Sequence, residues 1–216
     1  MSLRDNIRIK IREKMNPYFG PVRRFLGGVN PDFTIISNNC WAGHVYRYYN
    51  VPYKTPTIGL FFFADDYVKF CKNLKYYINL ELRFLPIEES KHYDFIREKG
   101  LGIIPIGILD DVEIVFLHYK SEEEAYKKWE RRKSRICWDN LFFKFSEQNQ
   151  CTYKELEQFD MIDTKNKFVF VSKDYGLKSQ VVFRDYLDLG EVPNDTTNFR
   201  KYINLSHFLM GKPFMR

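Results

Sequence analysis

The segment of residues 33–63 constrains the fold more than any other part of this chain. It contains an almost entirely apolar run (residues 33–37), a polar turn (37–43), a short aromatic helix and a second apolar run (56–63). Strands that are apolar on both faces are typical of parallel sheets covered by helices. A strand that passes into a helix through a small polar turn is where α/β folds bind ligands. The sequence therefore predicts core strands over both apolar runs and a ligand site at the turn.

Strands and helices alternate along the rest of the chain. Further strands are expected at residues 82–85, 103–109, 112–118, 141–145, 168–172 and 181–183. The pair Asp110-Asp111 between two of these runs is typical of a tight hairpin, which places one antiparallel element in the sheet. The pattern predicts an α/β layered fold with a mostly parallel, mixed sheet and helices on both faces. This architecture is Rossmann-like, but neither GxGxxG nor GxxxxGK[ST] occurs, so the sequence contains no dinucleotide fingerprint and no P-loop.

Helices are expected where a capping residue precedes a segment of apolar residues with helical spacing. The predicted helices cover residues 66–80, residues 121–136, a short segment after residue 152 and a segment near residues 199–210. The predicted capping residues are Asp65, Ser121 with Glu124, and Thr152 with Glu155. Cys71 lies in the apolar stripe of the first of these helices, so we expect it to be inert core.

The positive charge of the chain is concentrated at its N-terminus. Residues 1–30 hold seven Lys and Arg residues and two acidic residues, which is +5 of the formal net charge of +6. A near-neutral remainder argues against a nucleic-acid binder, in which positive charge is spread over a face of the fold. The sequence therefore divides into a basic N-terminal helical segment, residues 1–30, and a single α/β domain, residues 31–216.

Within the basic segment a helix is predicted to end before Pro17. Its apolar stripe consists of Leu3, Ile7, Ile11 and Met15. One interpretation is an ordinary helix docked on the body of the protein. The other is an interfacial helix that makes weak peripheral contact with anionic lipid through residues 1–15.

The cysteines indicate a reducing compartment. They are Cys40, Cys71, Cys137 and Cys151, which lie far apart and form no CxxC pair. Because no secretory signal is recognisable, we expect a cytoplasmic protein with free thiols, at most peripheral to the inner face of the membrane. The longest apolar run, residues 58–64, is too short to span a bilayer.

The turn after the first strand carries the candidate ligand-binding residues, which are Ser37, Asn38, Asn39 and Gly43. Backbone N–H groups at a helix N-terminus favour an anion such as the diphosphate of a nucleotide sugar, and amide side chains suit sugar hydroxyls. The same position makes Cys40 a candidate nucleophile. The structural alternative is that Asn38 caps the helix and Cys40 only packs. No cofactor is predicted; a sugar or nucleotide sugar is the expected ligand.

His118 is the candidate base for Cys40. It ends the predicted strand of residues 112–118 and would approach the turn if the two strands are close in the sheet. A Cys40–His118 dyad would then serve a thiol-dependent hydrolase or acyltransferase. The alternative is a hydrogen-bonded structural histidine.

The helix of residues 121–136 carries a basic group formed by Arg131, Arg132 and Arg135. Arg132 shares an otherwise apolar stripe, so we expect it to be buried with a carboxylate or phosphate partner. The functional interpretation is an anion clamp for a phosphate. The structural alternative is ion pairing with a nearby aspartate such as Asp110, Asp111 or Asp139.

No metal site is predicted. Asp65-Asp66 is similar to the acidic pairs that hold a metal in many nucleotide-sugar transferases, but it lacks the DxD spacing. His44, His92 and His207 show no ligand-like spacing.

Three blocks of the sequence resemble a bacterial family of unknown function, whose members are often labelled exopolysaccharide or capsular polysaccharide biosynthesis proteins. The blocks are FTIISNNCWAGHVYRYYNVPYKTPTIGLFFFADDYVKF, IPIGILDDVEIVFLHYKSEEEAYKKWERRKSRICWDNLFF and NKFVFVSKDY, within residues 33–175. The resemblance implies a pathway rather than a set of catalytic residues. The KxxRR-containing helix and the following strand are also similar to a second bacterial family, described as papain-like, in which Cys40 would be the matching thiol.

Together these patterns leave three functional hypotheses. The first is a sugar- or sugar-nucleotide-dependent transferase of surface-polysaccharide biosynthesis. The second is the thiol-dependent enzyme with Cys40 and His118. The third is a non-catalytic accessory protein of polysaccharide assembly, for which the basic N-terminal helix would be the membrane contact.

Overall fold

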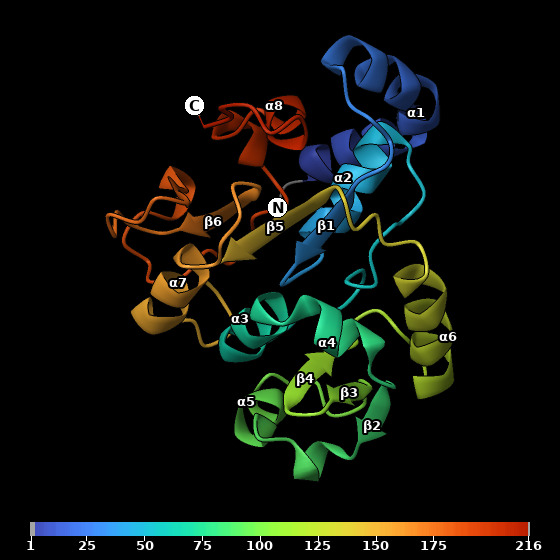
Figure 1. Ribbon diagram of the computed structural model, residues 1–216, viewed down its shortest axis with the longest axis vertical. Coiled ribbons are helices and arrows are strands. Elements are labelled where there is room, and N and C mark those ends of the chain that lie inside the picture. The colour runs from blue at the N-terminus through green and yellow to red at the C-terminus, as the bar shows by residue number, and fades with distance from the viewer. Residues whose placement is uncertain (1–2, 216) are drawn as a thin grey trace.

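The computed structural model describes the backbone of residues 3–215 and the side chains of residues 14–215 (Figure 1). Within these residues the main sheet is entirely parallel, with the strand order β1-β5-β6-β7. Its strands are β1 (Thr34–Ser37), β5 (Leu141–Ser146), β6 (Lys167–Val171) and β7 (Gln180–Val182). The carboxyl ends of these strands therefore meet at one edge of the sheet.

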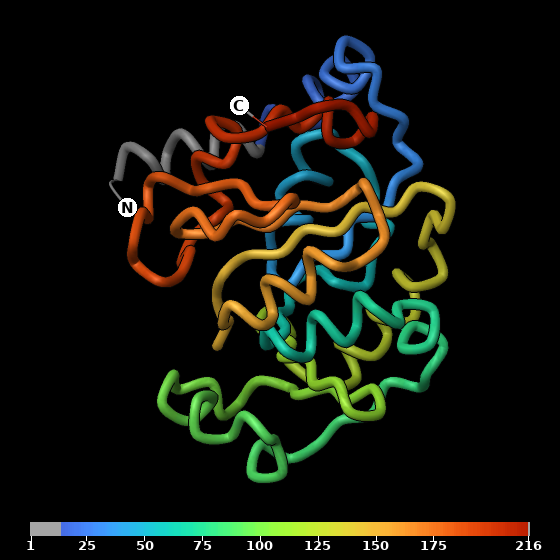
Figure 2. The backbone as a smooth tube through the Cα atoms, turned by 60° about the vertical axis from the view of Figure 1, so that its left-hand side comes forward, coloured from blue at the N-terminus to red at the C-terminus, as the bar shows by residue number. Residues whose placement is uncertain are grey.

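Successive residues of each strand face opposite sides of this sheet. Ile35 and Phe142 pack in one core with α2 (Trp41–Tyr49) and α8 (Leu205–Leu209). Ile36 and Phe143 pack in the other core, against helices on the opposite face. These helices are α3 (Ala64–Lys72), α4 (Leu74–Asn79), α6 (Glu122–Lys133) and α7 (Tyr153–Asp160). Figure 2 shows the main sheet between the two layers, so the predicted α/β layered fold with helices on both faces is confirmed.

A second, antiparallel sheet lies beside the first. It consists of β2 (Arg83–Leu85), β3 (Ile106–Leu109) and β4 (Val112–Val115), with α5 (Tyr93–Glu98) in the connection between β2 and β3. The hairpin predicted at Asp110-Asp111 is confirmed, and Asp110 takes up a left-handed conformation with φ of 56°. The hairpin is not part of the main sheet, however, so the expectation of one mixed sheet is wrong in this respect.

The apolar run of residues 56–63 explains why the sheets are separate, and it does not form the predicted strand. Within the described residues, Phe61 makes an isolated antiparallel bridge with Val115, while the Phe62 N–H donates to the carbonyl of Asn38. The run therefore passes between the two sheets. It is apolar because it is buried on both sides, and a short apolar run does not by itself distinguish a strand from another buried segment.

Helix starts follow the capping residues in two of three cases. Ser121 Oγ accepts the N–H of Glu124 at the start of α6, and Thr152 with Glu155 forms a complete capping box at α7. The predicted helix of residues 66–80 is two helices, broken at Asn73, and it begins at Ala64. Asp65 therefore lies in the first turn and is not the cap. The expected helix near residues 199–210 is a single turn, Phe199–Lys201, followed by α8.

The N-terminal helix is longer than predicted. α1 (Leu3–Gly27) continues through Pro17 and Pro21 and packs on α2. Proline interrupts a helix by removing one hydrogen bond, and contacts with the body compensate for this loss here. No helix within residues 3–215 is both long enough and apolar enough to cross a bilayer.

Candidate functional site

A cavity of about 430 Å³ lies at the carboxyl edge of the main sheet, just beyond the ends of β1 and β5. Its polar wall is formed by Asn39, Gln148, Asn149, Asn194, Asp195 and Thr196. Phe61, Phe95 and Leu117 contribute apolar surface, and Lys99 adds a positive charge near Phe95. The switch from strand to loop in open α/β sheets is the usual position of a ligand crevice.

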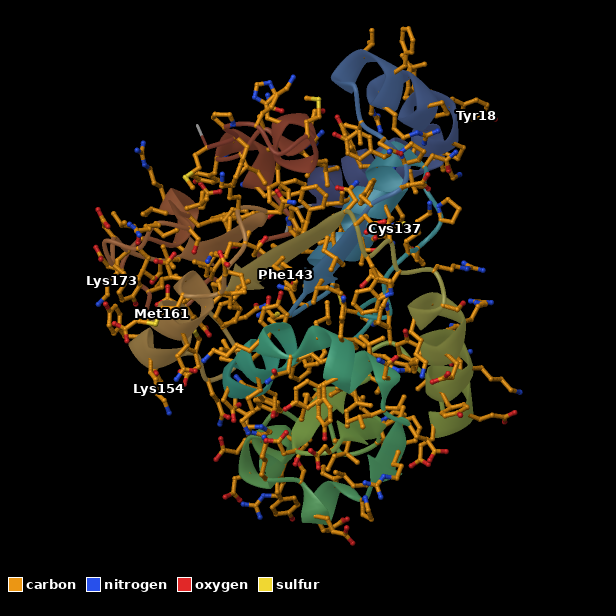
Figure 3. All side chains as sticks on the ribbon, viewed as in Figure 1. Tyr18, Cys137, Phe143, Lys154, Met161 and Lys173 are labelled. Carbon is orange, nitrogen blue, oxygen red and sulfur yellow. The ribbon has the colours of Figure 1, made fainter. Side chains whose placement is uncertain are left out.

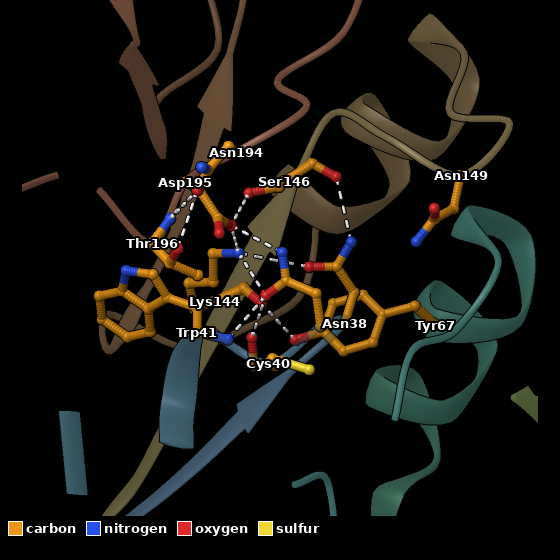
Figure 4. Close-up of polar contacts among 12 residues, drawn as sticks. Asn38, Cys40, Trp41, Tyr67, Lys144, Ser146, Asn149, Asn194, Asp195 and Thr196 are labelled. Carbon is orange, nitrogen blue, oxygen red and sulfur yellow. Dashed lines mark hydrogen bonds and ion pairs between the residues drawn. The ribbon is translucent and has the colours of Figure 1, made fainter. Parts of the chain in front are cut away.

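A buried ion pair lies at the floor of this cavity (Figure 4). Lys144, from β5, is 0% exposed, and its ammonium pairs with Oδ2 of Asp195, which is 1% exposed. Lys144 Nζ also donates to Asn39 Oδ1 at 3.0 Å. Asp195 Oδ2 accepts further hydrogen bonds from Ser146 Oγ at 2.5 Å and from Asn39 Nδ2 at 2.8 Å. Its other oxygen, Oδ1, makes no hydrogen bond with the described residues.

The alternation of β5 places these groups together. Phe142, Lys144 and Ser146 project from the same face of the strand, the face covered by α2. Lys144 lies 5.8 Å from the ring centre of Trp41, the first residue of α2. This distance is measured from Nζ, so the ammonium itself lies beside the aromatic ring.

Burial of two charges is costly unless each has a strong partner. Burial is the largest influence on Lys144 and lowers its pKa, while the negative charge of Asp195 acts in the opposite direction. Buried, perturbed ionisable groups beside a cavity are frequent at functional sites. The pair therefore marks the floor of the cavity as the best candidate site.

Some residues of the predicted turn are buried beneath the cavity, and others line it. Ser37 and Asn38 are fully buried; Ser37 Oγ donates to Asn39 Oδ1, and Asn38 Nδ2 donates to the carbonyl of Ser146. Gly43 is buried within α2. Asn39 and Cys40 line the cavity. Asn39 Oδ1 also accepts the N–H of Trp41, so Asn39, rather than Asn38, supplies a side-chain acceptor at the start of α2.

No hydrogen bond joins the Cys40 thiol to a histidine or a carboxylate within the described residues. Its thiol makes a long contact of 3.9 Å with the carbonyl of Leu60. Burial, and next the charge of Asp195, raise the pKa of the Cys40 thiol above its usual value. His118 is exposed and shares no hydrogen bond with Cys40 within residues 14–215. This arrangement favours the neutral thiol, and a nucleophilic cysteine requires the thiolate.

The predicted basic group does not line this cavity; Arg131 and Arg132 lie in α6, and Arg135 follows the end of this helix. Arg131 and Arg135 are exposed, and Arg132 is buried as predicted. The expected carboxylate partner of Arg132 is not found among the described residues. Its guanidinium donates to the carbonyl of Ile58 and the hydroxyl of Tyr119. It also lies 5.1 Å from the ring centre of Tyr53, and this cation–π contact helps to stabilise the charge.

Asp65, Asp66 and His92 offer ligand atoms within 4.8 Å of one another. The ammonium of Lys91 pairs with Asp66 and lies 3.6 Å from Asp65, so a positive charge already occupies this cluster. Burial, as the largest cause, raises the pKa of Asp66. The ammonium of Lys91 and the hydrogen bond between Asp66 and His92 Nε2 account for the contacts of this cluster.

Lys144, Ser146 and Asp195 were not among the residues singled out from the sequence. One signal was available, because Lys144 interrupts the otherwise apolar strand LFFKFS, and a lysine inside a buried strand requires a partner. Asp195 lies in a loop 51 residues away, where no local pattern marks it.

Comparison with known proteins agrees with the expected family of unknown function. Residues 17–210 match a family model described as "Domain of unknown function (DUF1919)". A protein of Haemophilus influenzae called "Uncharacterized protein" is 33% identical over 146 residues, which are 68% of this chain and 65% of that protein. The match thus spans less than two thirds of the relative's length. On the family match, which covers most of the sequence, the chain belongs to the family described as Domain of unknown function (DUF1919).

Proposed function

We propose that the protein binds a sugar or a nucleotide sugar in the cavity at the carboxyl edge of the main sheet and acts as a group transferase on it. The observation that carries the proposal is the polar wall of amide and hydroxyl side chains around the buried Asp195. Amides both donate and accept hydrogen bonds, which matches the two roles of a sugar hydroxyl. The nearby Phe61 and Phe95 suit the apolar faces of a sugar ring.

The size and charge of the cavity support a ligand of this class. Its volume of about 430 Å³ falls within the range of roughly 300–1,000 Å³ that is usual for small-molecule sites. Lys99, which follows α5, also lines the cavity and would contact a phosphate group of a nucleotide sugar. On the resemblance to proteins labelled for polysaccharide biosynthesis, we propose the assembly of surface polysaccharide as the pathway.

Asp195 is the group we assign to proton transfer. Lys144, Ser146 and Asn39 hold the carboxylate through Oδ2, which leaves Oδ1 for a ligand. During transfer, Oδ1 would accept the proton of an acceptor hydroxyl while that oxygen forms its bond to the donor carbon. The bond from this carbon to the diphosphate would break, and the nucleoside diphosphate would leave with the electron pair.

The experiment is a thermal-shift and calorimetric screen with nucleotide sugars, the corresponding nucleoside diphosphates and free monosaccharides. A ligand at 100 times its dissociation constant adds about 2.7 kcal/mol of stability. At about 2–4 °C per kcal/mol for a domain of this size, the melting temperature would rise by several degrees. Failure of all three ligand classes to bind would overturn the proposal and favour the accessory protein.

A matched pair of variants locates the binding. Gln148 lines the cavity, and its side chain makes no hydrogen bond with the described residues, so Gln148→Ala should leave the fold intact. Gln158 on α7 contacts Lys72 at the surface and does not line the cavity. We expect Gln148→Ala to weaken ligand binding and Gln158→Ala to leave it unchanged. Equal affinity of both variants and the natural protein would place the ligand elsewhere.

A further inference from the structure

Over residues 14–27, α1 packs on the body with its polar face and exposes its apolar face. The residues of α1 that face the body are Asn16, Gly20, Arg23, Arg24 and Gly27, spaced as one side of a helix. Helices of water-soluble domains are normally arranged the other way, with the apolar side inward.

Hydrogen bonds and close packing hold this inner face in place. Arg23 donates to the carbonyl of Tyr48 at 2.8 Å, and Arg24 donates to the carbonyls of Tyr49 and Asn50 at the end of α2. Gly20 allows the two helices to approach, because a Cβ at this position would lie 2.5 Å from the Cβ of Asn50. The orientation of α1 is therefore specified by contacts that leave the apolar side outward.

The exposed side is a continuous apolar stripe. Tyr18 is 75% exposed, Phe25 87% and Leu26 78%, and Figure 3 shows Tyr18 on the outer side of the helix. Met15, Phe19 and Val22 extend the same stripe. It begins at Met15, where the stripe expected from the sequence ends. The side chains of Leu3, Ile7 and Ile11 lie outside the described residues. A contiguous exposed patch of this kind marks an interaction surface.

The charge of the segment identifies the partner. Residues 1–30 carry seven basic and two acidic residues, and no acidic residue follows Glu13 within this range. Arg23 and Arg24 face the body, and the other five basic residues precede the stripe. A second copy would bring another +5 against this charge, which opposes pairing of two α1 helices. An anionic lipid surface attracts the basic residues and accepts tyrosine, phenylalanine and leucine side chains at its interface.

We propose that α1 docks the protein on anionic membranes through the stripe from Met15 to Leu26. This inference is independent of the ligand proposed for the cavity. In Figure 1, α1 lies at one end of the long axis and α5, which contributes a wall of the cavity, lies toward the other end. Docking through α1 would therefore leave that wall of the cavity open to water.

Sedimentation with vesicles tests the proposal on the full chain. The vesicles consist of phosphatidylcholine alone or of an equimolar mixture with phosphatidylglycerol. The test variant is Phe25→Ser/Leu26→Ser, and the matched control is Leu187→Ser/Leu189→Ser, which removes two other exposed apolar side chains. We expect binding to the mixed vesicles that weakens strongly between about 0.1 M and about 1 M salt, as the screening length falls. The test variant should partition at least about tenfold less, and the control should match the natural protein.

A fluorescent variant and a measurement of oligomeric state complete the test. Phe25→Trp should shift its emission to the blue on addition of mixed vesicles, because the indole enters the interface. Binding of the Phe25→Ser/Leu26→Ser variant equal to that of the natural protein would overturn the proposal. A dimer in light scattering that this variant dissociates, without vesicle binding by the natural protein, would also overturn it and assign the stripe to a second copy.

Discussion

Oδ2 of Asp195 pairs with the ammonium of Lys144, and both side chains are buried at the carboxyl edge of the main sheet. This contact joins β5 to the loop that carries Asn194 and Thr196, so one ion pair closes a wall of the cavity and orients the carboxylate in it. An ion pair of this kind is weak evidence for stability, since apolar replacements are often equally stable. Its position beside a cavity is better explained by a role in the site.

We therefore expect the single and double replacements of this pair to differ. Lys144→Met leaves the Asp195 carboxylate buried without its counter-ion and should cost about 3–5 kcal/mol of unfolding free energy. Lys144→Met/Asp195→Leu removes both charges and should recover most of this loss. Urea unfolding followed by circular dichroism measures the unfolding free energy of both variants. A Lys144→Met protein as stable as the natural one would show that the pair is not closely coupled.

The reactivity of Cys40 distinguishes the transferase from the thiol enzyme. Burial raises the pKa of this thiol above its usual value. The thiolate fraction, and with it the alkylation rate, should therefore be small at neutral pH and increase about tenfold per pH unit up to about pH 9. Iodoacetamide labelling with peptide mapping gives the rate for each cysteine, and the urea-unfolded chain provides the reference. Rapid labelling at neutral pH that His118→Ala suppresses would instead support the Cys40–His118 dyad.

Patterns within a few residues predict much of this fold. Apolar strands that are buried on both faces, the caps at Ser121 and Thr152 and the hairpin at Asp110 all follow from local chemistry. The continuation of α1 through Pro17 does not, because it depends on contacts with α2. Propensity is a weak prior wherever such tertiary contacts exist.

Prediction of the site from local sequence patterns is limited in the same way. The turn after β1 could be identified because strand, polar turn and helix are adjacent in the sequence, and Asn39 and Cys40 of this turn do line the cavity. The other half of the site comes from β5 and from a distant loop. Lys144 and Asp195 meet only because β5 pairs with β1 and the loop folds over both ends, and no local spacing encodes that contact.

Arg132 is expected to contribute less than a buried ion pair would. Its partners are a carbonyl, a hydroxyl and an aromatic ring, so Arg132→Met leaves no charge uncompensated. The loss of hydrogen bonds to Ile58 and Tyr119 should cost about 1–3 kcal/mol. The exposed Arg135→Met, just beyond the end of the same helix, is the control and should remain within about 0.5 kcal/mol of the natural protein. A cost for Arg132→Met well above this range would indicate an anionic partner.

The contact between α1 and α2 can be tested with two glycines that lie in neighbouring helices. Alanine is favoured over glycine in a helix by about 1 kcal/mol, so propensity alone predicts that both Gly20→Ala and Gly43→Ala stabilise the protein. Packing, in contrast, predicts different effects for the two substitutions. A Cβ at residue 43 would lie 3.8 Å from Ile58, an ordinary contact, whereas a Cβ at residue 20 would lie 2.7 Å from the backbone carbonyl carbon of Tyr49.

We expect Gly43→Ala to be neutral or stabilising in thermal unfolding, and Gly20→Ala to cost about 1–3 kcal/mol or to release α1. Release of α1 would also remove the inward contacts of Arg23 and Arg24. Limited proteolysis would detect this release as faster cleavage of the segment. If Gly20→Ala stabilised the protein as much as Gly43→Ala, the close approach of α1 to α2 would be wrong, and with it the outward orientation of the apolar stripe.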